Sequence, residues 1–185
     1  GIEEGITKLP VTLVNTHVDM DHTNCNWQFS RIFMHPSEYF LYHRNMGRND
    51  RIEPLWDGTV FSLGDREIVA VMNPGHTSGS VTFLDTKGRR IVGGDSIQNG
   101  RIFLFGETRD LLAFAHSMRR MENFLDKVDK VYPSHADCPV DAGIIPKLAE
   151  GVERMLRGEV KGTPSSYEGT PIREFDIGPA VILYE

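Results

Sequence analysis

Short apolar runs separated by polar turns dominate the chain, and most of these runs have the length of β-strands. Strands are predicted over residues 11–14, 31–34, 59–61, 67–72, 80–85, 89–92, 130–132 and 180–184. Helical spacing appears instead in three segments, over residues 36–44, 110–125 and 140–157. In the second of these, Leu111, Phe114, Met118, Met121 and Leu125 form one apolar face, which predicts core packing. The polar segments 45–53 and 161–170, and the segment 96–106 with its aromatic residues, are predicted to be loops.

Length and charge narrow the class of protein. The chain has 185 residues, which favours a single domain over residues 1–185 that buries about 70% of its unfolded surface. A formal net charge of −6 argues against a nucleic-acid partner and against an anionic membrane surface. No apolar run approaches the length of a bilayer span, and the opening residues do not resemble a signal peptide. A cytoplasmic protein without a membrane or nucleic-acid partner is therefore expected.

The cysteines and three of the histidines suggest no site of their own. Cys25 and Cys138 offer no disulfide framework, so both are expected to be reduced thiols. His35, His43 and His116 lie outside the motifs described below and are expected at the surface.

The segment from Asn15 to His22 carries the strongest chemical signal. If the chain is extended there, His17, Asp19 and Asp21 share one side, while Val18 and Met20 point into packing. His22 breaks this alternation, so the backbone is expected to turn at that point. Four ligand-type residues within six positions suit a site for two cations. The alternative is a solvated strand-to-helix loop with acidic caps.

Three further positions favour the metal site over that alternative. His76, Asp95 and His135 each follow an apolar run and lie in a turn rich in Gly, Pro or Ser. Residues at strand ends meet at a common edge of a sheet, where loops carry function on a rigid scaffold. The three residues are therefore predicted to converge on the segment that contains His17.

The order T-H-x-x-x-D-H, G-H-T-x-G-S, G-G-D, P-S-H resembles the metallo-β-lactamase-fold hydrolases, and in particular their glyoxalase-II-like branch. This resemblance implies an α+β fold, an αββα sandwich, over the chain from about Val11 onward. It also implies two divalent cations. One would be held by His17, Asp19 and His76, the other by Asp21, His22 and His135, with Asp95 bridging them.

Asp19 departs from the family pattern, which has a histidine at this place. An additional oxygen ligand shifts the preference of a site towards harder ions. Zinc is the first choice for both positions, with iron or manganese as alternatives. A site with one metal, or an inactive site, is the other interpretation of Asp19.

A second departure concerns the amino end. Only sixteen residues precede His17, whereas family members begin with several strands. The fold is therefore expected to be amino-terminally truncated. Missing strands would expose apolar sheet edges, which makes a homodimer possible.

The expected function is that of a metal-dependent hydrolase, in which a hydroxide between the two cations attacks a small ester, thioester, lactone or amide. Asp21 would be the catalytic residue, because it is placed to orient that hydroxide and to accept its proton. Phe103 and Phe105 either line an apolar pocket for the small-molecule substrate or cover the core. The alternative function is a non-catalytic or redox metal-binding domain, similar to flavodiiron proteins, with an altered first site.

Overall fold

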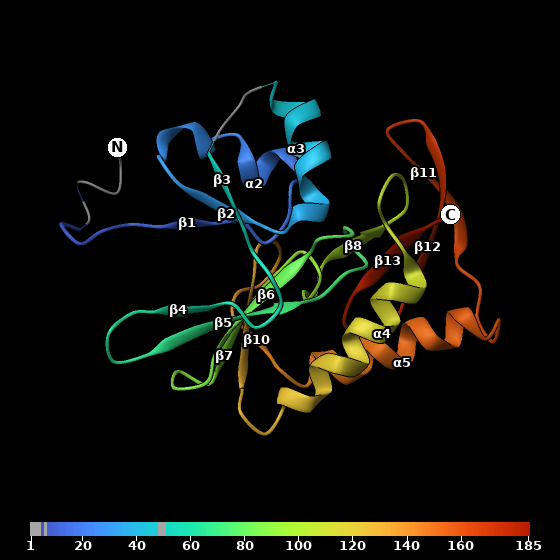
Figure 1. Ribbon diagram of the computed structural model, residues 1–185. Helices are drawn as coiled ribbons and strands as arrows, with labels where there is room; N and C mark the ends of the chain where they lie inside the picture. Colours follow the sequence, from blue (N-terminus) through green and yellow to red (C-terminus); the bar gives the residue numbers. More distant parts are fainter. Residues whose placement is uncertain (1–4, 6, 48–50) are drawn as a thin grey trace.

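A six-stranded sheet forms the centre of the computed structural model, which describes residues 5, 7–47 and 51–185 (Figure 1). Its strands are β4 (Val60–Ser62), β5 (Glu67–Met72), β6 (Val81–Asp85), β7 (Arg90–Gly94), β9 (Lys130–Pro133) and β10 (Val140–Asp141). The order across the sheet is β10-β9-β7-β6-β5-β4. Only the β7–β9 pair is parallel, so β5, β7 and β9 run in the same direction and end at the same edge.

A small parallel sheet stacks on the central one. It consists of β1 (Leu13–Val14), β2 (Ile32–Met34) and β3 (Ile52–Pro54). Between these strands lie α2 (Met20–Thr23), η1 (Asn26–Gln28), η2 (Pro36–Glu38) and α3 (Tyr39–Met46). Phe33 of β2 packs against a buried cluster that includes Ala70 of β5 and Phe83 of β6, and this contact joins the two sheets.

A third sheet is built from later parts of the chain. It contains β11 (Thr163–Tyr167), β12 (Thr170–Asp176), β13 (Val181–Tyr184) and β8 (Arg101–Leu104) in that order. β8 and β13 are parallel, which brings a segment near residue 103 beside the end of the chain. This sheet lies beside the carboxyl-terminal helices in Figure 1.

Two long helices cover the outer face of the central sheet. They are α4 (Leu111–Met121), followed by η3 (Glu122–Phe124), and α5 (Ile144–Leu156). Asp110 begins α4 as its N-cap, since its carboxylate accepts a hydrogen bond from the Ala113 N–H. The predicted apolar face of α4 is confirmed: Phe114, Met118 and Met121 are buried, and they pack with Leu84 and Ile91 in the largest core cluster.

The predicted α+β fold is confirmed. Helix α3 packs on the small sheet through Leu41 and Tyr42, the small sheet packs on the central sheet, and the central sheet packs on α4 and α5. This order of layers is the αββα sandwich expected from the sequence. Within the described residues, no helix is both long and apolar enough to cross a lipid bilayer.

Several local predictions were wrong. The loops predicted over 96–106 and 161–170 contain β8 and β11, and the loop predicted over 45–53 contains the start of β3, although residues 48–50 lie outside the described part. The helix predicted from residue 140 begins at Ile144, because Val140 and Asp141 pair with β9 instead. β11 is polar and exposed, so no apolar alternation marks it; its pairing with β12 makes it a strand.

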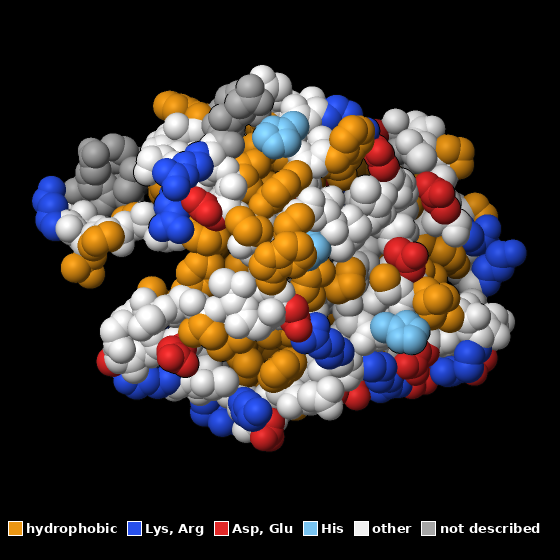
Figure 2. All heavy atoms as spheres, viewed as in Figure 1, with side chains coloured by type: hydrophobic (Ala, Val, Ile, Leu, Met, Phe, Trp, Pro, Cys, Tyr) orange, Lys and Arg blue, Asp and Glu red, His pale blue; other side chains and the backbone are white. Residues whose placement is uncertain are grey.

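Exposed apolar side chains gather between the half of the molecule that holds α2 and α3 and the half that holds β4 and β5 (Figure 2). The large exposed apolar residues of the chain include Trp27, Phe40, Trp56, Val60 and Leu63. The homodimer expected from such surfaces stays a prediction.

Candidate metal centre

Seven histidine and aspartate side chains meet at one edge of the central sheet. His76 follows β5, Asp95 follows β7 directly, and His135 follows β9. Because these three strands run in the same direction, their carboxyl ends place all three residues at the same edge. The segment after β1 supplies His17, Asp19, Asp21 and His22 from the neighbouring small sheet.

The segment after β1 is not the extended row predicted from the sequence. Asp19 is the N-cap of α2, and Asp21 and His22 lie within this helix. Val18 is buried as expected, but Met20 is exposed, because the helix turns it away from the core. Because of this helical turn, the side chains of Asp21 and His22 belong to a different group of candidate ligands from that of His17.

The first group contains His17, His76 and Asp95, all of them buried, with candidate ligand atoms within 4.8 Å of one another. Asp19 lies beside this group: its Oδ2 atom is 3.3 Å from His76 Nε2 and 3.7 Å from His17 Nε2. The second group contains Asp21, His22 and His135. Asp21 Oδ2 lies 3.3 Å from His22 Nε2 and 3.2 Å from His135 Nε2.

Asp95 lies between the two groups. Its Oδ1 atom is 3.3 Å from His22 Nε2, and its Oδ2 atom is 3.3 Å from His135 Nε2 and 3.7 Å from His76 Nε2. Gly94, directly before it, has a φ of +58°, and a Cβ atom there would come within 3.1 Å of the Thr16 side chain. Glycine at this position therefore permits the close approach of β7 to the His17 segment.

This donor set fits divalent cations. His17 Nε2, His22 Nε2 and Asp95 Oδ1 are buried, and among the described residues none of the three has a hydrogen-bond partner. Buried polar atoms are nearly always paired in folded proteins, so three unpaired atoms at one point indicate a site for a positively charged group. Imidazole and carboxylate groups are the usual ligands of zinc and of other first-row metals.

Hydrogen bonds orient two of the imidazoles. Thr16 Oγ1 lies 3.0 Å from His17 Nδ1, and the carbonyl oxygen of Phe103 lies 3.0 Å from His76 Nδ1. A contact to Nδ1 leaves Nε2 directed at the centre, which is the usual arrangement of a metal-binding histidine.

The charges of the centre shift several pKa values. Burial lowers the pKa of His17, which keeps this imidazole neutral. Burial alone would raise the pKa of Asp95, but the close imidazole of His22 and the neighbouring imidazoles of His17 and His76 lower it to about 2. Burial opposes ionisation of Asp19 as well, yet the close imidazoles of His17 and His76 and the charge of Arg109 hold its pKa well below the usual range. Both carboxylates are therefore anionic and both are available to cations.

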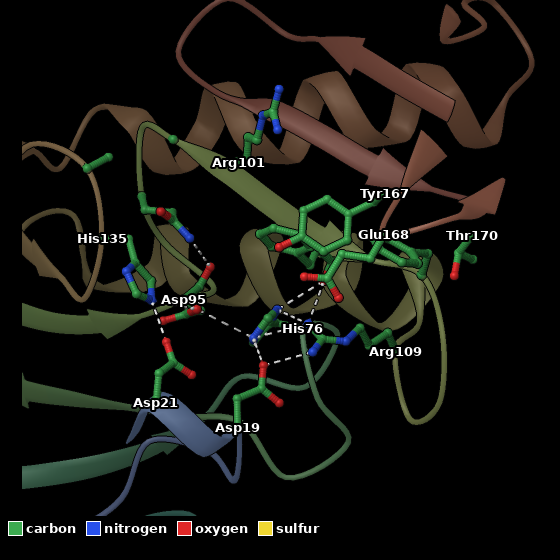
Figure 3. A pocket seen from close by; sticks show the side chains of 15 residues that line it. Asp19, Asp21, His76, Asp95, Arg101, Arg109, His135, Tyr167, Glu168 and Thr170 are labelled. Carbon is green, nitrogen blue, oxygen red and sulfur yellow. Dashed lines mark hydrogen bonds and ion pairs between the residues drawn. The ribbon is translucent and has the colours of Figure 1, made fainter. Parts of the chain in front are cut away.

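A cavity of about 810 Å³ opens beside the centre. Figure 3 shows Asp19, Asp21, His76, Asp95 and His135 around this cavity, with Tyr167 and Glu168 on its opposite side. Phe103 and Phe105 line it as well, and their rings pack with that of Tyr167 at centroid distances of 5.0 to 5.9 Å.

Sequence reasoning missed Arg109, Glu38 and Tyr167. Arg109 contacts Asp19 across 90 residues of sequence, and Tyr167 belongs to the unpredicted strand β11. Glu38 is fully buried, where its two carboxylate oxygens accept hydrogen bonds from the backbone N–H groups of Val18 and Gly79. No local pattern marks these residues, because each acts through a contact with a distant segment.

The histidines and cysteines outside the centre follow the predictions in part. His43 and His116 are exposed as expected, but His35 is buried, because its ring packs against Trp56 and its Nδ1 atom accepts a hydrogen bond from the Ser37 N–H. Cys25 and Cys138 are free and exposed.

Comparison with known proteins identifies the family. The sequence model of the metallo-beta-lactamase superfamily matches residues 8–135, which is more than half of the chain and includes all seven residues of the centre. The chain belongs to the metallo-beta-lactamase superfamily. A protein of this superfamily from Pontibacter korlensis, a metallo-beta-lactamase, has 17% sequence identity and a TM-score of 0.64, over 79% of this chain and 71% of that one. TTHA1623 in a di-iron-bound form has 22% identity and a TM-score of 0.61, over 74% of each chain.

Two curated relatives of this superfamily member are named as thioesterases. The human acyl-coenzyme A thioesterase MBLAC2 is 25% identical over 167 residues, which cover 72% of this chain and 58% of the relative. The atrochrysone carboxyl ACP thioesterase of Aspergillus fumigatus is 26% identical over 153 residues, which cover 80% of this chain and 44% of the relative. The chain thus spans 58% of the length of the human relative and 44% of the length of the Aspergillus relative.

Proposed function

We propose that this chain is a metal-dependent thioester hydrolase with a centre for two divalent cations. The observation that carries the proposal is the pair of His/Asp groups that share Asp95 and open onto one cavity. The thioesterase names of the human and Aspergillus relatives favour a thioester over the ester, lactone and amide alternatives.

The two cations would be held by the residues expected from the sequence. His17, Asp19 and His76 would bind the first, Asp21, His22 and His135 the second, and Asp95 both. Four imidazoles among these seven groups favour zinc, with iron and manganese as alternatives because of the three carboxylates. When bound, such cations supply Lewis acidity and lower the pKa of water towards neutrality.

The protein's own groups would position the thioester and move the proton. Asp21 lines the cavity, and its Oδ2 atom contacts His22 and His135, so Oδ1 would be the atom that accepts a proton from the attacking water. Phe103 and Tyr167 would pack against the apolar acyl group. Water adds to the thioester carbonyl, the C–S bond breaks, and the products are a carboxylate and a thiol that takes up one proton.

Release of free thiol from acyl-coenzyme A tests this function. The native protein is expected to release thiol, to lose this activity after treatment with a chelator, and to regain it with added zinc. Asp21→Asn removes the proton acceptor and is expected to lower kcat by about 100-fold or more, a typical effect for a general base. Asp65→Asn, on the exposed surface where Asp65 pairs with Lys87, is the matched control and should leave kcat unchanged.

Two outcomes would contradict the proposal. The first is a native protein that binds zinc but releases no thiol from acyl chains of any length. The second is thiol release that survives complete removal of metal.

A further inference from the structure

Arg109 reaches the first group of ligands from outside the predicted motifs. It follows β8 and precedes the N-cap of α4, and its Nη2 atom lies 2.8 Å from Asp19 Oδ2. Its Nη1 atom donates a hydrogen bond of 3.2 Å to the carbonyl oxygen of Phe103 and lies 2.8 Å from His76 Nδ1. Figure 3 shows the guanidinium directed at Asp19 and His76.

The pair is shielded from solvent. The side chain of Arg109 is 18% exposed and that of Asp19 is 28% exposed. Exposed ion pairs contribute little because water and salt screen them, but partly buried pairs are screened much less. Water and salt therefore screen the positive charge of Arg109 less than they screen the charge of an exposed arginine.

The candidate ligands carry three negative charges before Arg109 is counted. Three carboxylates, those of Asp19, Asp21 and Asp95, face the two groups of ligands. The oxygen of Asp19 that points at His17 and His76 is the same atom that contacts Arg109. A carboxylate oxygen that accepts a hydrogen bond from a guanidinium donates less charge to a cation, and the pair has no net charge.

We propose that Arg109 is the counter-charge of Asp19, so that the pair acts at the first cation position as one neutral ligand. This inference rests on the proposed metal centre. The effects of Asp19 and Arg109 on metal binding would then depend on each other. If residue 19 is made neutral, the positive charge of the residue at position 109 must be removed as well. Arg109 is a positioning residue in this account, since it acts on the cation through Asp19.

The mutual dependence of Asp19 and Arg109 predicts the order of zinc affinities among the native chain and its variants. Asp19→His supplies a good zinc ligand, yet it leaves the guanidinium unpaired beside a dication. At an effective dielectric constant of about 20, this repulsion amounts to several times RT, so zinc at the first position should bind at least about tenfold more weakly than in the native chain. Adding Arg109→Met removes the repulsion, and the double variant should return to within about threefold of native affinity.

Zinc affinity measured by competition with a chromophoric chelator tests the proposal. The set is the native chain, Asp19→His, Asp19→His with Arg109→Met, and the matched control Arg101→Met. Arg101 lines the same cavity but points away from Asp19, is 57% exposed and lies 4.0 Å from the carboxylate of Glu174. The control should bind zinc like the native chain. Circular dichroism of the metal-free proteins checks that each variant is folded.

The outcomes separate the inference from the function. If the native chain binds two zinc ions and Asp19→His binds them equally well, Arg109 is not a counter-charge and the inference fails alone. The same holds if Arg109→Met does not restore affinity in the Asp19→His background. If the native chain binds no zinc, the inference and the proposed function fail together. Should histidine at position 19 prevent folding, Asp19→Asn with and without Arg109→Met gives the same comparison without added bulk.

Discussion

Glu38 holds together the two segments that carry the first group of ligands. Its side chain is fully buried, Oε2 accepts a hydrogen bond of 3.0 Å from the Val18 N–H, and Oε1 accepts one of 2.7 Å from the Gly79 N–H. Val18 lies between His17 and Asp19, and Gly79 lies three residues after His76. Glu38→Gln retains the shape of the side chain but replaces one acceptor oxygen by an NH₂ group.

The magnitude follows from the lost acceptor. In Glu38→Gln, one backbone N–H must face the new NH₂ group and is left unpaired in the interior. An unpaired buried donor costs about 1–3 kcal/mol of unfolding free energy. For a chain of this size each kcal/mol lowers Tm by about 2–4 °C, so a loss of about 2 kcal/mol corresponds to roughly 4–8 °C.

Urea unfolding of the metal-free protein measures this loss, and the zinc affinity of the same variant should fall because His17 and His76 lose their common anchor. The matched control is Glu107→Gln, in which the same substitution removes an exposed ion pair with Arg44 and should leave the unfolding midpoint unchanged. A Glu38→Gln protein with native stability and native zinc affinity would refute the proposed role of Glu38.

Three further predictions concern the surroundings of the centre. Gly75→Ala should destabilise the chain and weaken zinc binding far more than Gly58→Ala does. A Cβ atom at Gly75 would lie 2.5 Å from the backbone of Phe114, whereas a Cβ atom at Gly58 would have no described atom within 4 Å; chelator competition and thermal unfolding measure both effects. Phe103→Ala should raise KM for long acyl chains more than for acetyl thioesters, and an equal rise for both would exclude an acyl site. Burial raises the pKa of Glu38 above its ordinary value near 4.5, so native stability relative to Glu38→Gln should be greatest below pH 4.5 and should decline as the pH rises through the raised pKa; urea unfolding of the metal-free proteins at several pH values checks this sign.

The sequence was sufficient for the elements whose apolar pattern matches their burial. β5 has the predicted bounds, and the face of α4 around Phe114 and Met118 is buried as predicted. These elements are half-buried, and their periodicity therefore shows in the sequence. The sequence was insufficient for β11, whose polar residues become a strand only through pairing with β12.

The residues of the candidate centre also fall into those that the sequence predicts and those that it does not. Residues such as Asp95 follow a strand directly, and the strand therefore places them at the edge of the sheet. Asp19 was recognised as unusual from its position in the motif, but its partner Arg109 was not, because the contact joins segments 90 residues apart. Contacts of this kind depend on how the layers pack, which the local pattern does not specify.

The metal content of the purified protein after zinc loading and dialysis, for the native chain and for Asp95→Asn, tests the central claim most directly. The account predicts about two equivalents in the native chain, as in other two-metal sites, and the loss of at least one in Asp95→Asn, because Asp95 contacts both groups of ligands. Less than one equivalent in the native chain, or two equivalents retained in Asp95→Asn, would contradict it.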